Sequence, residues 1–112
     1  MYKKSEKLLE RALSSIPLAS QTFSKSLTQY PRGVSPFFIE KGKGSKVWDV
    51  DGNEYIDFVS SLLSVTLGYC DKDIDSAVQE QMKNGVIFSL PHTLEMEVAE
   101  KLIGIIPCAE KV

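Results

Sequence analysis

The chain has 112 residues, of which 43% are hydrophobic and 25% are charged, and its formal net charge at pH 7 is −2. This composition predicts one globular domain with a modest core. It argues against a membrane protein, because no apolar run approaches the roughly 20 residues of a membrane span. The first ten residues also lack the apolar region of a signal peptide. We therefore expect a cytoplasmic location.

Charge is divided unevenly along the chain, with a net +6 over residues 1–46 and a net −8 over residues 47–112. The basic residues are spread over several predicted elements, and the aromatic residues among them show no stacking pattern. The sequence therefore argues against nucleic-acid binding. We expect complementary electrostatic fields within one fold or across a dimer.

The chain contains few soft metal ligands, namely Cys70, Cys108 and His92. The two cysteines form no CxxC pair, so the sequence supports neither a zinc site nor a disulfide framework, and we expect both thiols to be free and buried. His92 precedes the last predicted helix, where a role at the helix start is favoured over a place in a catalytic triad.

The N-terminal residues predict a helix that Ser5 caps and Pro17 stops. Its apolar residues recur at three-to-four spacing and form one stripe, made of Leu8, Leu9, Ala12, Leu13 and Ile16. Residues 18–35 are rich in Ser, Thr and Gln and have neither a helical nor a strand period. We expect them to form a long loop.

Residues 37–40, 46–50 and 54–58 are rich in β-branched and aromatic side chains and predict three strands. Gly42-Lys43-Gly44 and Asp51-Gly52-Asn53 separate these segments and are typical of turns, so we expect an antiparallel meander. A calcium loop is an alternative interpretation of the second turn. It fails because the glycine is misplaced and the twelfth loop position is a serine, so no metal site is predicted.

Residues 59–70 are apolar and uncharged, and Gly68 interrupts them; we expect a buried, irregular connector of the kind that lines sites. Asp71 is a candidate N-cap for a helix that ends at Asn84-Gly85. A last helix is predicted from about residue 93 to 106, before Pro107. The apolar faces of these two helices are Ile74, Ala77, Val78 and Met82, and Leu94, Val98, Leu102 and Ile105.

The predicted fold class is thus α+β, with an N-terminal helix, a long loop, a three-stranded antiparallel meander and two C-terminal helices. Four segments in this order resemble class III pyridoxal-phosphate aminotransferases, and within them the glutamate-1-semialdehyde aminomutase branch most. These segments are SEKLLERALSSIP, FFIEKGKGSKVWDVDGNEYIDF, LGYCDKDIDSAVQEQMKNG and PHTLEMEVAEKLIGIIPCAEKV. The resemblance covers residues 5–112 and implies the N-terminal part of a fold-type I transferase, with part of the small domain and the start of the cofactor domain.

The resemblance also implies the cofactor pyridoxal phosphate (PLP), small-molecule amino donors and acceptors, and a homodimer for the full-length enzyme. The family holds PLP with a phosphate-binding loop, an acidic residue on the pyridine nitrogen and a Schiff-base lysine. All three follow the segment that residues 108–112 match. We therefore assign no catalytic or cofactor-binding residue in this chain, and we expect the isolated polypeptide to bind no PLP and to be inactive.

Four residues are substrate-site candidates by family position: Thr22, Lys25, Ser61 and Leu62. The aminomutase branch has an arginine where this chain has Lys25 and a tryptophan where it has Leu62. Lysine keeps a positive charge but lacks the bidentate fork, and leucine removes an aromatic wall, so a semialdehyde carboxylate would be gripped less specifically. These departures favour a different substrate, such as a carbonyl compound of a sugar pathway.

Three functions are consistent with these residues. The chain is the leading part of an aminotransferase or aminomutase, or a non-catalytic module that dimerises or pairs with a full-length relative, or a remnant that folds poorly. In the second case, apolar helix stripes would form a protein interface. Cooperative unfolding and a defined oligomer would favour the module over the remnant.

Overall fold

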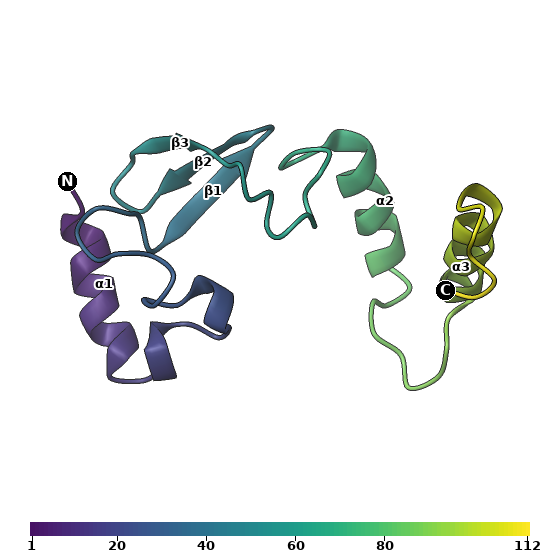
Figure 1. Cartoon of the computed structure of the whole chain (residues 1–112), viewed down its shortest axis with the longest axis horizontal. Helices are drawn as coiled ribbons and strands as arrows, with labels where there is room; N and C mark the ends of the chain where they lie inside the picture. The colour runs from purple at the N-terminus through teal and green to yellow at the C-terminus, as the bar shows by residue number, and fades with distance from the viewer. The chain divides into compact units, whose positions relative to one another are not determined.

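The computed structural model describes all 112 residues, which form two compact units, Met1–Asp75 and Ser76–Val112. The first unit holds a helix and a three-stranded sheet, and the second consists of helical segments and their connections (Figure 1). None of the helices combines the length and the apolarity that crossing a bilayer requires. The predicted α+β class and the order of its elements are confirmed.

The sheet is the predicted antiparallel meander, with strands β1 (Ile39–Lys43), β2 (Lys46–Asp49) and β3 (Glu54–Ile56) in the order β1-β2-β3. Lys43 pairs with Lys46 across the first turn, and Val47 pairs with Tyr55 across the second. The first strand was predicted two residues too early. It continues through the first predicted turn to Lys43, because only Gly44, at φ +56°, has the left-handed conformation that the reversal requires.

Helix α1 (Lys3–Leu13) begins earlier than predicted, and the prediction that Ser5 caps it is wrong. Ser5 lies in the first turn and is fully buried. The cap comes from the turn between β2 and β3, where the Asp51 carboxylate accepts hydrogen bonds from the backbone N–H groups of Lys4 (2.7 Å) and Ser5 (2.9 Å). A carboxylate at this position satisfies two free donors of the helix and complements its positive end.

The apolar core of the first unit is small, and its only buried hydrophobic side chains are Leu9 of α1 and Val47 of β2. The loop after α1 is less irregular than predicted, since it contains two short 3-10 helices, η1 (Pro17–Ala19) and η2 (Phe23–Lys25). An ion pair of 2.6 Å between Arg32 and Glu6 joins this loop to α1.

A buried carboxylate, Asp49, organises the second turn of the meander. One oxygen accepts the backbone N–H groups of Asp51 and Asn53, and the other accepts the Asn53 amide (2.8 Å) and the Tyr55 hydroxyl (2.9 Å). Burial by itself raises the pKa of Asp49, but these hydrogen bonds outweigh it and lower the pKa below the ordinary value. Asp49 thus stabilises the turn between β2 and β3, and Asp51 caps α1.

The two C-terminal helices, α2 (Lys72–Met82) and α3 (Thr93–Ile105), have the predicted caps. Asp71 accepts two backbone N–H groups of the first turn of α2. His92 accepts the Leu94 N–H, while Glu95 accepts the His92 N–H, so the two residues form a capping box. Gly85 follows α2 at φ +101°, and the predicted helix-start role of His92 is confirmed.

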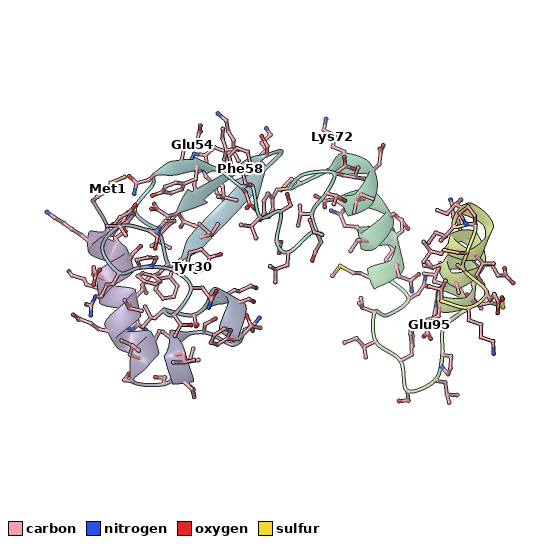
Figure 2. All side chains as sticks on the ribbon, in the orientation of Figure 1. Met1, Tyr30, Glu54, Phe58, Lys72 and Glu95 are labelled. Atoms are coloured by element: carbon pink, nitrogen blue, oxygen red, sulfur yellow. The ribbon has the colours of Figure 1, made fainter.

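Three predictions of burial are wrong. Neither α2 nor α3 has a buried residue, and on their predicted inner faces Val78 and Val98 are half exposed. Residues 59–70 are irregular, as predicted, but mostly exposed, and Phe58, two residues after the end of β3, is 90% exposed (Figure 2). The two cysteines are free, as predicted, but exposed. These segments are apolar by sequence, and in this structure no other residues cover them.

Candidate functional site

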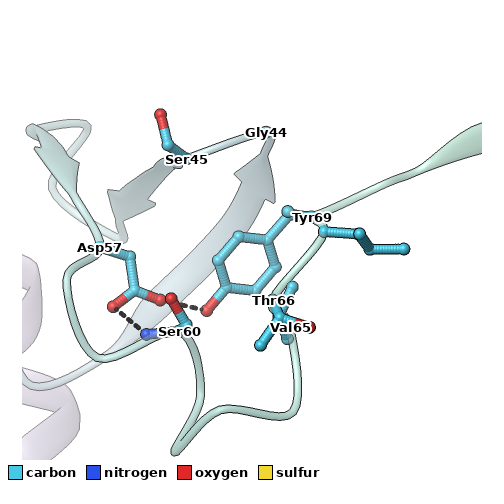
Figure 3. Close-up of a pocket in the computed structure, with 9 residues that line it drawn as sticks. Gly44, Ser45, Asp57, Ser60, Val65, Thr66 and Tyr69 are labelled. Atoms are coloured by element: carbon cyan, nitrogen blue, oxygen red, sulfur yellow. Dashed lines mark hydrogen bonds between the residues drawn. The ribbon is translucent and has the colours of Figure 1, made fainter. Parts of the chain in front are cut away.

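A cavity of about 170 Å³ lies in the first unit, where the turn between β1 and β2 meets the end of β3 and residues 60–69 (Figure 3). Its lining combines backbone, hydroxyl groups and one carboxylate, and consists of Gly44, Ser45, Asp57, Ser60, Val65, Thr66, Leu67, Gly68 and Tyr69. The segment 58–70, called the connector below, provides most of this lining. The cavity is smaller than the roughly 300–1,000 Å³ that is usual for ligand pockets.

Tyr69 fixes the far end of the connector to the sheet. Its hydroxyl donates a hydrogen bond of 2.6 Å to Asp57, and its backbone exchanges two hydrogen bonds with Gly44, of 2.8 and 2.9 Å. The phenol ring lies directly against Gly42, where an added methyl group would overlap the ring. Glycine is therefore required at position 42 by the ring, because the backbone there does not have a positive φ.

Asp57 fixes the near end of the connector. One carboxylate oxygen accepts the backbone N–H group of Val59 (2.9 Å). The same oxygen accepts that of Ser60 (3.1 Å), and the other oxygen accepts the Tyr69 hydroxyl (Figure 3). The hydrogen bond from Tyr69 is the main cause that lowers the pKa of Asp57, and the backbone donors add to it against burial. The same bond, with burial, raises the pKa of Tyr69 to about 12. At neutral pH the pair therefore consists of a carboxylate and a phenol, which suits holding a structure rather than transferring protons.

Between these two anchors the backbone adopts an unusual conformation. Four successive residues have left-handed φ angles: Ser60 (+48°), Ser61 (+51°), Leu62 (+56°) and Leu63 (+70°). For residues other than glycine this conformation costs roughly 1–2 kcal/mol each, so the run 60–63 opposes an intrinsic preference of about 4–8 kcal/mol. Hydrogen bonds to a charged group contribute roughly 1.5–3 kcal/mol each, so the three bonds to Asp57 are of the size needed to offset it. Strain of this kind is typical of functional segments.

Two further cavities adjoin the connector within the first unit. One, of about 340 Å³, lies between residues 64–70 and the start of α2, and the other, of about 500 Å³, opens beside Lys43 and Lys72. Both lysines are exposed and neither takes part in an ion pair.

The four candidate substrate residues lie on two exposed segments of the first unit. Thr22 and Lys25 lie at η2, where the Lys25 N–H donates to the Thr22 carbonyl, and Lys25 has no ion-pair partner. Ser61 and Leu62 lie within the left-handed run, and Leu62 is 63% exposed. No hydrogen bond joins the two segments, and none of the four residues lines the cavities described above.

Sequence reasoning missed the two residues that organise the site, Asp57 and Tyr69. A signal was available, since an acidic residue directly follows the third strand and an aromatic residue follows Gly68 at the end of the apolar stretch. Their separation by twelve residues gives no periodic pattern, so only the fold brings them together.

Comparison with known proteins decides the family, since residues 29–112 match the family described as aminotransferase class III. The chain belongs to the class III aminotransferases. This aminotransferase chain is 37% identical over 109 residues to the glutamate-1-semialdehyde 2,1-aminomutase of Aquifex aeolicus (strain VF5), which covers 97% of the chain and 25% of that relative. The chain thus spans about a quarter of the length of such curated relatives, or less.

Solved structures agree with this assignment. An omega-transaminase from Sphaerobacter thermophilus superposes with a TM-score of 0.82 at 30% identity, covering 96% of this aminotransferase chain and 23% of that structure. The PLP internal aldimine form of the FumI protein from Sphingopyxis sp. MTA144 gives a TM-score of 0.81 at 27% identity, covering 96% and 25%. The prediction that the chain has the fold of the N-terminal part of a fold-type I transferase is therefore confirmed. PLP is the cofactor of the full-length family.

The residues of the 170 Å³ cavity do not fit PLP. The cofactor requires a lysine for its aldehyde and polar partners for its pyridine nitrogen and phosphate. No lysine lines the cavity, and both oxygens of Asp57, its only carboxylate, are already engaged by Tyr69 and the backbone. The cavity therefore belongs to the structure that holds the connector.

Proposed function

We propose that residues 1–112 form the N-terminal part of a PLP-dependent aminotransferase or aminomutase, with part of its small domain and the start of its cofactor domain. They serve the substrate side of the site, and other parts of the full-length enzyme hold the cofactor. The observation that carries this proposal is the strained run 60–63, which lies in the family-matched region and exposes Leu62. Strain that the surrounding structure maintains is most often retained where it serves a site.

Lys25 and Leu62 determine what substrate this site prefers. An exposed lysine offers an anionic substrate a single point charge, whereas arginine would offer two parallel donors. Leu62 offers an apolar contact without the flat face of an aromatic ring. With Thr22 and Ser61 as neighbouring hydroxyl groups, the site suits a small carbonyl compound that is less dependent on a carboxylate than glutamate-1-semialdehyde.

The remaining features of the proposal follow the family. The full-length enzyme is a cytoplasmic homodimer that transfers amino groups between small molecules. The isolated chain of 112 residues neither binds PLP nor catalyses the transfer, because none of its lysines occupies the Schiff-base position and the 170 Å³ cavity beside Asp57 does not fit the cofactor.

A chimera tests this function. Residues 1–112 replace the matching segment of the Aquifex aeolicus aminomutase, and PLP binding and amino transfer are measured for the chimera, the parent enzyme and the chain alone. We expect activity in the chimera and none in the chain alone. A chimera that folds and binds PLP but transfers no amino group from any donor would contradict the proposal.

The substrate residues are tested in the same chimera. Lys25→Arg and Leu62→Trp should each lower the KM for glutamate-1-semialdehyde, by roughly tenfold for the pair, because a bidentate contact and an aromatic wall are restored. Lys83→Arg is the matched control, because Lys83 is exposed on the second unit and pairs only with Glu80. An unchanged KM in the double variant would remove these two residues from the substrate site.

A second candidate function is a non-catalytic module that dimerises or pairs with a full-length relative. The exposure of Ile74, Val78 and Met82 on one face of α2 favours it, because such faces are usually covered. Sedimentation of the chain alone distinguishes the two functions. A stable dimer that Val78→Lys dissociates supports the module, and a monomer at all concentrations contradicts a module that dimerises with itself.

A further inference from the structure

The contact between Tyr69 and Asp57 has a consequence for the substrate side of the site. We propose that these two residues are a positioning pair, which sets the left-handed run 60–63 and thereby the placement of Ser61 and Leu62. This inference deepens the proposed function and rests on it. Neither residue touches the substrate, and both act through the backbone between them.

The first step is the geometry of the two anchors. Asp57 accepts the N–H groups of Val59, which directly precedes the run, and of Ser60, which is its first residue. These bonds orient the peptide planes immediately before the first left-handed residue. A single carboxylate directly after β3 thus stabilises the unusual conformation of the run.

The second step is that Tyr69 orients this carboxylate. Its hydroxyl binds the second oxygen of Asp57 at 2.6 Å, so the first oxygen remains directed at the backbone (Figure 3). Tyr69 is itself fixed by its ring against Gly42 and by two backbone hydrogen bonds to Gly44. The position of the connector is therefore fixed relative to the β1–β2 hairpin.

The third step connects the pair to Ser61 and Leu62. The side chains of these two residues have no hydrogen bond that would orient them, and the bonds of Ser61 involve its backbone, whose carbonyl accepts from Ser64. The directions of their Cα–Cβ bonds are consequently set by the backbone angles of the run. A change of a few tens of degrees in the run would redirect Leu62 without unfolding the sheet.

The structure contains a matched control for this inference. Tyr55 donates a hydrogen bond of 2.9 Å to Asp49, in the same unit and to the same kind of acceptor. That pair stabilises the second turn of the meander and has no contact with the connector. Tyr69→Phe and Tyr55→Phe therefore remove the same chemical group from two places, of which only one precedes the substrate residues.

Amide hydrogen exchange of the 112-residue chain is the first test. Tyr69→Phe should accelerate exchange of the Val59 and Ser60 amides by about tenfold, the effect of losing one charge-assisted hydrogen bond, while amides of β2 remain protected. Tyr55→Phe should leave these two amides unchanged. Equal acceleration in both variants, or none in Tyr69→Phe, would overturn the positioning pair whether or not the chain belongs to an active enzyme.

Kinetics of the chimera are the second test. Tyr69→Phe and Asp57→Asn should raise the KM for the amino acceptor by about tenfold with little change in kcat, because the substrate contacts are misplaced while PLP remains bound. Tyr55→Phe should lower only thermal stability. Kinetics of Tyr69→Phe that match those of Tyr55→Phe would overturn the proposal. An inactive parent chimera refutes the proposed function instead, and amide exchange then still decides whether the pair holds the run.

Discussion

In the meander and α1, polar groups from distant parts of the chain meet, whereas the caps of α2 and α3 are all local. Asp51 caps α1 from 47 residues away, and Tyr69 reaches Asp57 across 12. Asp71 and His92, in contrast, bind backbone groups only two or three residues ahead. The first region is therefore specified by tertiary hydrogen bonds, and the second by capping residues that directly precede each helix.

The two regions also differ in what they bury. The first unit encloses Leu9, Val47 and the carboxylate of Asp49, while α2 and α3 enclose nothing. Substitutions in the first unit should consequently change its stability by amounts typical of a folded core. Substitutions on the helix faces should have little effect unless another surface covers them.

The largest expected effect is that of Asp49→Ala. The substitution leaves the Tyr55 hydroxyl, the Asn53 amide and two backbone donors without their acceptor, and should destabilise the unit by about 3–4 kcal/mol. Urea titration followed by the fluorescence of Trp48, the only tryptophan, measures it. Glu97→Ala on α3 is the control and should change stability by less than about 0.5 kcal/mol. A loss below about 1 kcal/mol for Asp49→Ala would contradict the central role of this carboxylate.

The same substitution, glycine to alanine, can be compared at one position in each region. Gly42→Ala places a methyl group in the ring of Tyr69 and should destabilise the first unit by about 2 kcal/mol. Gly104→Ala meets open space on α3 and should increase helicity, with a gain of roughly 0.5 kcal/mol. Trp48 fluorescence reports the first change and far-ultraviolet circular dichroism the second. If both substitutions were neutral, the packing of Tyr69 on β1 would be wrong.

An alkaline transition should be confined to the first unit. The pKa of Tyr69 is raised from 10.0 to about 12 in the folded chain, so folding favours the neutral phenol. Its contribution to stability is complete below pH 10 and is lost as the pH rises from 10 towards 12. Burial and the hydrogen bonds with Tyr2 and Asp49 also raise the pKa of Tyr55. Phenolate absorbance should therefore show two late-titrating tyrosines, of which Tyr69→Phe removes one. Loss of a tyrosine that titrates near pH 10 instead would argue against the bond to Asp57.

The smallest effect is expected on α3. Val98 is 55% exposed, so Val98→Lys should change the stability of the chain by less than about 0.5 kcal/mol. Leu9→Lys, in contrast, introduces a charge at a fully buried position and should clearly destabilise the first unit. A large loss of stability or of assembly in Val98→Lys would mean that a second surface covers this face.

Much of the fold could be predicted because its signals are local. Turn residues separated the three strands, and Asp71, His92 and Pro107 marked the helix ends. The cap of α1 could not be predicted, because a serine at position 5 is a strong local signal that a distant carboxylate overrides. Burial was predicted only from the apolar character of the segments. Apolar residues indicate that a segment can pack against another surface, but they do not identify that surface.

The candidate site was less predictable than the fold. The resemblance to the family predicted Ser61 and Leu62 as substrate-site residues, and the structure shows that both lie in a strained run. The left-handed angles could not be foreseen, because serine and leucine do not favour them and glycine normally marks such positions. What maintains them is the pair of Asp57 and Tyr69, which no local pattern connects.

The central claim is that residues 1–112 serve the substrate side of the site while other parts of the full-length enzyme hold PLP. It is tested most directly by measuring PLP binding to the isolated chain and to the chimera with the Aquifex aeolicus aminomutase. Each protein is mixed with PLP, reduced with borohydride, desalted and digested, and the cofactor mass is located by peptide mass spectrometry. We predict that the chimera carries PLP on a lysine outside residues 1–112 and that the isolated chain carries none above the level of a random-lysine control. Specific, stoichiometric labelling of one lysine within residues 1–112 would contradict the account.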